Sequence, residues 1–499
     1  MLRAGSPGVI PSRARGPMRS GRLGVRTLML LIGTSGAVLW AARIILDTAA
    51  PVHQWAREIR QGTIDRRQEA ALRLRDVAPG ELGVAVPALV AALRDDDEAV
   101  VVAAAESLGP AGQASIRAGD AGAARTAVEA LAAALGDQRP GVRTAAIGGL
   151  SNAIAAGPLE ARSAGAIITA LVGLLDDESP EIRSMAAMAF RPLGQHNQIP
   201  PPAGLIAALE GDRSADVRAL AAQSLGRFRA GRDVATLALL RALGSDEPQV
   251  RAACDEALVN LQLSKGQRRS VALVPALIDA LAGHERRVRY HGAAILSEIG
   301  PGAVTAVPAL VGMLTEPADP ELSRGRIDPI GLDLACQAAS ALGDVAPGTP
   351  RAGEVVGALV EVFRTPGLNQ RRAMAAQALV GFDPKDIEPA MPVLLAVLSE
   401  TVGDIGPPAP SVCMALGRTA AATPRSAEAV AVLTKALDSG WEYTRCEAAR
   451  ALAGFGGRAS TAVPRLRALA TGDEHQFVRD AASSALSTIG ETADRLGPH

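Results

Sequence analysis

One short helical pattern recurs along almost the whole chain. A segment of the form Val-Arg-x-x-Ala-Ala-x-x-Leu, such as VRALAAQSL at 217–225, returns with small changes many times. A period of about 37 residues is typical of an array of helical units that pack on their neighbours. The apolar residues that close the preceding segments are Ile59, Leu93, Leu135, Leu175, Leu209, Leu243, Leu281, Leu314, Phe363, Leu398, Leu437 and Leu469.

Each unit is predicted to be a helix, a turn and a second helix. Small or acidic residues follow the first helix, as in DDES at 176–179. In the second helix a small residue and a large apolar residue lie three and seven positions after the arginine, on one helical face. Neither helix is long enough to be stable alone, so each must bury its face against a neighbour. Small residues allow close helix packing, which fits an aromatic content of only 2%.

The formal net charge of −1 hides an uneven distribution of charge. Residues 1–26 hold six arginines and no acidic residue, so the remainder of the chain is net acidic. A basic surface of the kind that binds nucleic-acid phosphates is therefore not predicted for the folded part.

A transmembrane anchor is predicted at 27–46. The residues from Thr27 to Ala42 are uncharged, and a helix of about 20 residues spans the hydrocarbon core of a bilayer. The alternative is a cleaved signal peptide, but cleavage after Ala42 or Ala50 fits the preferred small-residue pattern poorly. The arginines before the span predict a cytoplasmic N-terminus and an extracytoplasmic array, periplasmic in a bacterium.

The predicted organisation has five parts. They are a disordered basic tail at 1–26, the transmembrane anchor at 27–46, a membrane-proximal capping repeat at 47–80, the helical array at 81–490 and a disordered C-terminal tail at 491–499.

The segment VPALVAALRDDDEAV at 86–100, followed by the arginine pattern, resembles a HEAT repeat of the short type first noted in phycobilisome lyases. The resemblance implies an all-α, right-handed α-solenoid of about twelve repeats, with second helices on the concave side. It also implies a ladder in which turn acids and arginines of successive repeats tie each repeat to its neighbour. This sequence departs from that pattern at Val101, Ala335 and Ala409, which replace the arginine and are expected to interrupt the ladder. The predicted ladder arginines are Arg143, Arg183, Arg218, Arg251, Arg289, Arg372, Arg445 and Arg479.

A catalytic centre is not predicted. Cys254, Cys336, Cys413 and Cys446 form no CxxC pair, so a zinc site is not expected. The sequence contains no nucleophile elbow, P-loop or dinucleotide-binding motif, and no cofactor, metal or small-molecule substrate is predicted. Two interpretations stay open: a membrane-anchored, non-catalytic scaffold for a protein or peptide, or an enzyme or enzyme subunit of the phycobilin-lyase-like class.

A partner-binding surface is predicted at the second and fifth positions after the arginine, which point away from the alanine–leucine seam. Methionines there would give an adaptable apolar surface, although the same methionines could instead pack within the stack. Long insertions after Leu314 and Leu398 are either part of a binding face or tolerated surface variation. The candidate binding residues are Met185, Met188, Leu220, Gln223, Glu256, His291, Gln337, Met374, Gln377, Glu447 and Arg450.

Overall fold

The computed structural model describes residues 51–159, 161–196, 198–262, 269–316, 333–365 and 369–496. Within these ranges every regular element is an α-helix or a short 3-10 helix. The predicted basic tail at 1–26 and transmembrane anchor at 27–46 lie outside the described residues. The chain divides into two compact units, residues 1–127 and 128–499.

The first unit contains two helix–turn–helix pairs and the beginning of a third. Its elements are α2 (Pro51–Gln61), α3 (Ile64–Arg73), α4 (Leu82–Ala92), α5 (Glu98–Ala118) and the start of α6 (Ala121–Ala134), with the 3-10 helices η1 (Leu74–Asp76) and η2 (Pro79–Glu81). Helix α2 packs on α3, α4 packs on α5, and the two pairs contact each other through α2·α4 and α3·α5. Asp97 caps α5 by accepting hydrogen bonds from the backbone of Ala99 and Val100.

The second unit continues the same alternation of first and second helices. The second helices are α7 (Pro140–Ile154), α9 (Pro180–His196), α11 (Ala215–Leu225), α13 (Pro248–Gln262), α15 (Arg286–Ile299), α18 (Leu334–Val345), α20 (Asn369–Leu379), α23 (Ala409–Thr419), α25 (Glu442–Ala453) and α27 (Gln476–Leu496). The first helices that alternate with them are α8 (Ala161–Leu174), α10 (Ala203–Gly211), α12 (Arg232–Ala242), α14 (Val274–Ala282), α16 (Val307–Leu314), α19 (Ala352–Arg364), α22 (Met391–Thr401), α24 (Ser426–Ala436) and α26 (Val463–Gly472). Short helices join some of them: η3 (Val271–Leu273), η4 (Gly300–Ala306), α21 (Pro384–Ile387), η5 (Glu388–Ala390), η6 (Ala420–Ala422) and η7 (Gly456–Ala462).

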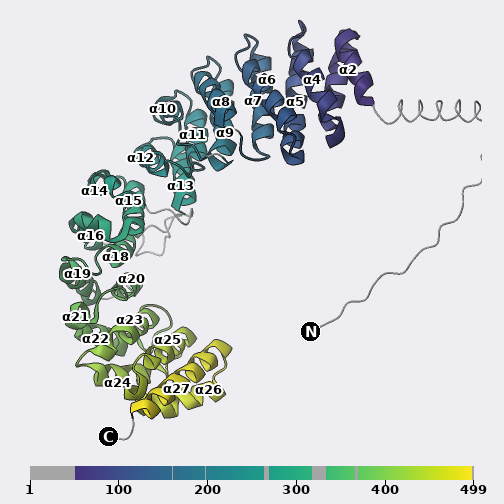
Figure 1. Ribbon diagram of the computed structural model, residues 1–499. Coiled ribbons are helices and arrows are strands. Elements are labelled where there is room, and N and C mark those ends of the chain that lie inside the picture. Colours follow the sequence, from purple (N-terminus) through teal and green to yellow (C-terminus); the bar gives the residue numbers. More distant parts are fainter. Residues whose placement is uncertain are drawn as a thin grey trace, which may run out of the picture. The chain divides into compact units, whose positions relative to one another are not determined.

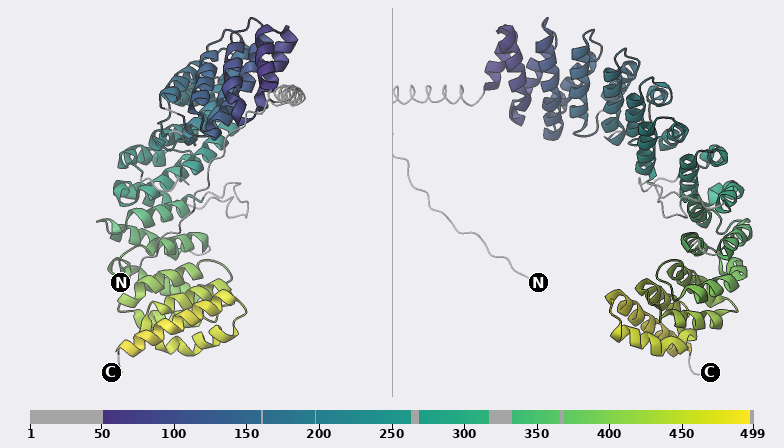
Figure 2. Two further views of the ribbon diagram at one scale, coloured as in Figure 1. Left: turned by 45° about the vertical axis from the view of Figure 1, so that its right-hand side comes forward. Right: turned by 180° about the vertical axis from the view of Figure 1, so that it is seen from behind.

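Successive second helices of this unit pack directly on one another, from α7·α9 and α9·α11 to α25·α27. In Figures 1 and 2 they form the inner row of the unit, and the first helices form its outer row. Several helices begin with proline at the first turn, where the missing N–H is not needed. This arrangement is an α-solenoid, as the spacing of the repeats predicts.

Glycine and alanine set the distance between neighbouring second helices. A Cβ atom on Gly226 at the end of α11 would lie 2.7 Å from the Cα of Ala257 in α13. Equivalent contacts join Gly343 to Ala378 and Gly417 to Ala451, at 2.7 Å and 2.5 Å. These distances are shorter than carbon–carbon contacts in packed interiors. The leucine–glycine ending of the repeat is therefore a packing requirement, because only glycine fits there.

The run Arg286–Leu314 has the length and mean hydropathy of a membrane-spanning helix, and among the described residues it is the one such run. It is not a continuous α-helix, because α15 ends at Ile299 and Gly300 has a φ of 70°. The 3-10 helix η4 then leads into α16. Since α15 packs against α14 and α18, the run belongs to two successive solenoid repeats.

The C-terminal prediction needs a correction. Helix α27 continues to Leu496, so 491–496 are helical rather than part of a disordered tail at 491–499. The segment ETADRL contains neither proline nor glycine before Gly497, so nothing in it ends the helix.

Replacing Gly417 by alanine tests the packing of the second helices. We expect Gly417→Ala to lower the free energy of unfolding by about 1–3 kcal/mol, because the added methyl group overpacks the contact with Ala451. Gly148→Ala in α7 is the matched control, since its Cβ would meet nothing within 4 Å, and we expect about 0.5–1 kcal/mol of stabilisation there. Urea denaturation followed by circular dichroism measures both. Equal effects of the two substitutions would contradict the packing role.

Candidate binding surface

Six of the eight predicted ladder arginines bind the turn that precedes their own helix. The Nη1 atom of Arg183 donates to the carbonyl oxygens of Asp177 and Glu178, at 2.8 Å and 3.2 Å. These carbonyls follow the end of a first helix, where intrahelical partners are missing. The same bond, from an arginine to the carbonyl six residues earlier, is made by Arg143, Arg218, Arg251, Arg445 and Arg479.

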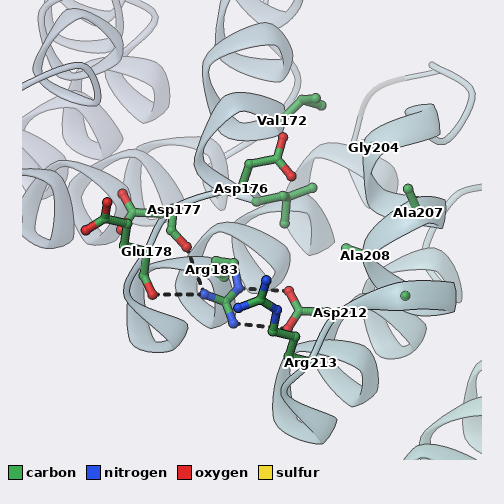
Figure 3. Close-up of a pocket in the computed structure, with 12 residues that line it drawn as sticks. Val172, Asp176, Asp177, Glu178, Arg183, Gly204, Ala207, Ala208, Asp212 and Arg213 are labelled. Atoms are coloured by element: carbon green, nitrogen blue, oxygen red, sulfur yellow. Dashed lines mark hydrogen bonds and ion pairs between the residues drawn. The ribbon is translucent and has the colours of Figure 1, made fainter.

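The other edge of the guanidinium reaches the acidic residue in the next turn. Arg183 donates through Nε and Nη2 to the two carboxylate oxygens of Asp212, at 2.8 Å and 3.2 Å (Figure 3). Asp212 also accepts a hydrogen bond from the backbone N–H of Ser214 at 2.8 Å, so it orders its own turn as well. Corresponding ion pairs join Arg67 to Asp95, Arg143 to Asp177, Arg218 to Glu247, Arg289 to Glu316 and Arg445 to Asp473.

The charges at these junctions stabilise each other's ionised forms. The hydrogen bond from Arg183 to Asp212 raises the pKa of that guanidinium. Burial is the largest single influence on Asp473 and opposes its ionisation. The hydrogen bonds from Arg445 and from the backbone of His475, together with the nearby positive charge, hold the pKa of the carboxyl below its ordinary value. Arg183 and Asp473 are therefore charged at neutral pH. The pairing of each with its partner, Asp212 and Arg445, is a charge-assisted, two-point contact.

At two of the interruptions, the acid that would have met the missing arginine pairs with a nearby arginine. In the turn after the Val101 repeat, Asp137 accepts two side-chain bonds from Arg139, at 2.9 Å and 2.8 Å. These bonds lower the pKa of Asp137 to about 2. After the Ala409 repeat, Asp438 pairs with Arg465 on α26.

The interruption at Ala335 has a different solution. The sequence between the end of α19 and Arg371, residues 365–370, contains no acidic residue. Instead Arg371 of α20 reaches back to Asp333 at 2.9 Å and to the carbonyl oxygen of Glu316 at 2.8 Å. Here the later repeat supplies the arginine and the earlier repeat supplies its acceptors, which reverses the usual direction of the ladder.

Three predicted ladder residues form weaker connections. The Nη1 atom of Arg372 lies 3.8 Å from Oε2 of Glu400, whose side chain is exposed. Among the described residues, neither Arg251 nor Arg479 has an ion pair; both bind the carbonyls of their own turns. Arg479 belongs to the last helix that the structure describes. The turn after Leu281 contains Glu285, but Arg251 forms no ion pair with it.

The predicted binding positions form a partly exposed column on the second helices. Met188 is 41% exposed, and Met185, Leu220 and Met374 are half-buried. Of the polar members, Glu256, Gln377 and Arg450 are exposed, and Gln223, Gln337 and Glu447 are half-buried. Apolar side chains on α9, α11 and α20 therefore have surface that the packing of the helices leaves uncovered.

His291 does not belong to this column. It is only 4% exposed, and its Nε2 lies 3.1 Å from Oδ1 of Asp255 on the preceding second helix. The edge of the Tyr290 ring also packs against it, with ring centroids 5.6 Å apart. The prediction that His291 faces a partner is wrong, because its imidazole is buried and contacts Asp255 of the preceding second helix.

Sequence reasoning missed two exposed rings, Tyr443 and Phe477. They occupy the second position before the arginine of α25 and α27, and the centroids of their rings lie 5.5 Å apart. The signal was present, because aromatic residues are rare in this chain and these two share one register position.

A hollow of about 560 Å³ lies beside the ladder, between α8 and α10. Figure 3 shows Arg183 at its base, with Asp176 and Glu178 on one side and Ala207 and Ala208 on the other. Its charged groups are those of the turns themselves. The hollow is the space between two successive repeats, and it brings together no acid–base pair suited to catalysis.

The cysteines have the environment of structural thiols. Burial raises the pKa of Cys254 and Cys336 to about 12, so both are protonated at neutral pH and are poor nucleophiles. Across the part of the chain that the structure describes, no three histidine, cysteine or acidic residues cluster to hold a metal ion.

The comparisons with known proteins agree with this architecture. A family model for HEAT repeats matches residues 410–495. Kap121p bound to Nup53p has 14% identity and a TM-score of 0.52, over 86% of this chain and 49% of Kap121p. A Kap121p mutant has 12% identity and a TM-score of 0.50, over 94% and 56%. The chain thus spans about half the length of these structures. No curated protein matches its sequence.

At such low identity the likeness to Kap121p shows the fold alone, an α-solenoid. Together with the segment that matches the HEAT-repeat model, it supports a solenoid built of HEAT repeats.

Replacing Arg183 tests the ladder. We expect Arg183→Gln to lower the free energy of unfolding by about 1–3 kcal/mol, because Asp212 is left with a half-buried, unpaired charge. Arg251→Gln is the matched control, since Arg251 binds only its own turn, and we expect a loss below about 1 kcal/mol. The measurement is urea denaturation of the purified full chain. A loss as large for Arg251→Gln would contradict the inter-repeat role.

Proposed function

We propose that this protein is a non-catalytic HEAT-repeat scaffold that binds a protein or peptide partner along the inner row of second helices. The observation that carries the proposal is the column at Met185, Met188, Leu220 and Met374. Its apolar side chains are partly exposed although the alanine–glycine seam, not these residues, joins the helices.

The composition of this column suits a protein partner. Methionine side chains are flexible and conform to irregular apolar surfaces. Glu256, Gln377 and Arg450 are exposed at the equivalent positions of other repeats, which gives the apolar positions a polar surrounding like the rim of a protein interface. An apolar centre with a polar rim favours recognition of another folded surface or an amphipathic segment.

One solved structure with this fold supports the class of partner. Kap121p is recorded bound to another protein, Nup53p. The repeats of the present chain also resemble the short, phycobilisome-lyase type, and we propose that subtype for them on the residues of their turns and second helices alone.

We further propose that residues 27–46 anchor the protein in a membrane, with the N-terminus in the cytoplasm and the solenoid on the other side. The uncharged stretch from Thr27 to Ala42 and the six arginines before it support this topology. The scaffold would then present its second helices to partners outside the cytoplasm.

Glutamate at three column positions tests the binding surface. We expect the combined variant Met185→Glu, Met188→Glu and Met374→Glu to keep its helicity and melting temperature, because none of these side chains is fully buried. It should lose the partner that crosslinking and mass spectrometry identify for the unmodified protein in native membranes. Val234→Glu on α12 is the control, since Val234 is an exposed apolar residue of the outer row, and it should keep the partner.

Two results would contradict the assignment. Unfolding of the triple variant would place the methionines in the core, and full retention of the partner would place the binding surface elsewhere.

A reporter fused after His499 tests the topology. A fluorescent protein that matures only in the cytoplasm should stay dark there, because the six arginines hold the N-terminus on the cytoplasmic side. The same reporter fused before Met1 is the control and should fluoresce. Bright cells from the C-terminal fusion would contradict the proposed topology.

A further inference from the structure

The last two described repeats carry an exposed aromatic cluster at their turns. Tyr443 is 54% exposed and Phe477 is 37% exposed. Their ring centroids lie 5.5 Å apart, and the Trp441 and His475 rings extend the cluster at 5.4 Å and 5.7 Å. Exposed large rings are a feature of interaction sites, and here they stand in a chain with 2% aromatic residues.

The two rings occupy a surface column that runs from repeat to repeat. Tyr443 and Phe477 lie two residues before the arginines of α25 and α27. Side chains at this register position meet their neighbours elsewhere too, since Gln249 donates to Asp216 at 3.1 Å. In other repeats of the second unit the position holds Gly141, Glu181, Asp216, Gln249, Arg287 and Gln370. The stacking of the solenoid therefore does not require an aromatic residue there.

Acidic residues lie close to the rings in the sequence. Glu442 adjoins Tyr443 in the sequence, Asp480 lies one helical turn after Phe477, and Glu474 precedes it in the turn. None of the three forms an ion pair with another described residue. The neighbouring guanidinium of Arg445 is bound to Asp473. These two turns thus combine exposed aromatic rings with acidic residues that form no ion pair among the described residues, and the Asp480 carboxylate accepts a hydrogen bond from Gln476.

We propose that Tyr443 and Phe477, with Glu442, Glu474 and Asp480 around them, bind an arginine side chain on an extended segment of the protein partner. This site deepens the proposed function and rests on it. A guanidinium lies flat on an aromatic face and is attracted by its negative quadrupole. Its five N–H groups can bind the surrounding carboxylates at the same time. A lysine ammonium lacks the planar face, so arginine is the better match.

A peptide of alternating arginine and serine, labelled with a fluorophore, tests the site on the full chain. Fluorescence anisotropy should show binding, and the variant Tyr443→Ala with Phe477→Ala should weaken it by roughly 2- to 30-fold. Matched peptides carrying lysine or glutamine in place of arginine should bind more weakly and not at all, respectively. The charge-removing variant Glu442→Gln, Glu474→Gln and Asp480→Asn should also weaken binding and reduce its dependence on salt.

Two control variants separate recognition from folding. Tyr443→Phe with Phe477→Tyr keeps both rings and should retain binding, and Ile405→Ala removes an exposed apolar side chain elsewhere and should change nothing. Undiminished binding by the double-alanine variant, or equal binding of the lysine peptide, would overturn the proposal. Tighter peptide binding after deletion of residues 1–26 would also overturn it, because the occupant would then be the chain's own arginine-rich segment.

The outcome is separable from that of the proposed function. Loss of the partner in the methionine variant, with no aromatic contribution to peptide binding, would leave the scaffold standing and remove this site. If the methionine variant keeps its partner while arginine-peptide binding still depends on Tyr443 and Phe477, the aromatic site stands. The methionine column is then removed as the binding surface.

Discussion

The arginine that joins two successive turns is the interaction on which the stacking of the repeats depends. Arg183 binds the backbone of its own turn and the carboxylate of Asp212. The carbonyl of Asp212 then accepts a bond from Arg218, which pairs with Glu247. Each of these three turns is thus linked to the next, so the orientation of one repeat depends on its neighbour. The glycine–alanine contacts, such as Gly417 with Ala451, set the separation of the second helices.

The arginine pairs and the glycine–alanine contacts do not involve every position of the second helix. The arginine, the small residues and the leucine are each committed to stacking. The second and fifth positions after the arginine are less constrained, although His291 at the second position is buried against Asp255. Met185 and Met188 occupy such positions in one repeat, and the Tyr443 ring lies at the turn end of a later one. Binding residues can therefore differ from repeat to repeat without a loss of stability, which is the property that a scaffold needs.

The sequence predicts what local periodicity determines. The helix pairs, the turns and the arginine positions follow from the spacing of apolar and small residues. The burial of His291 does not, because it depends on Asp255 of the preceding helix and on how far that helix is shifted. The pairing of Asp137 with Arg139 likewise depends on side-chain conformation within one turn. Tyr443 and Phe477 share a register position that the spacing gives, but the contact between their rings depends on how the two helices stack.

A double-mutant cycle on Arg183 and Asp212 is the most direct measure of coupling between repeats. The free energies of unfolding of Arg183→Gln, Asp212→Asn and the double variant are compared with that of the unmodified protein. We expect a coupling energy of about 1–2 kcal/mol, because the two residues share a two-point contact. Effects that add to within about 0.3 kcal/mol would show that the two side chains do not act together, and would contradict the ladder as the link between repeats.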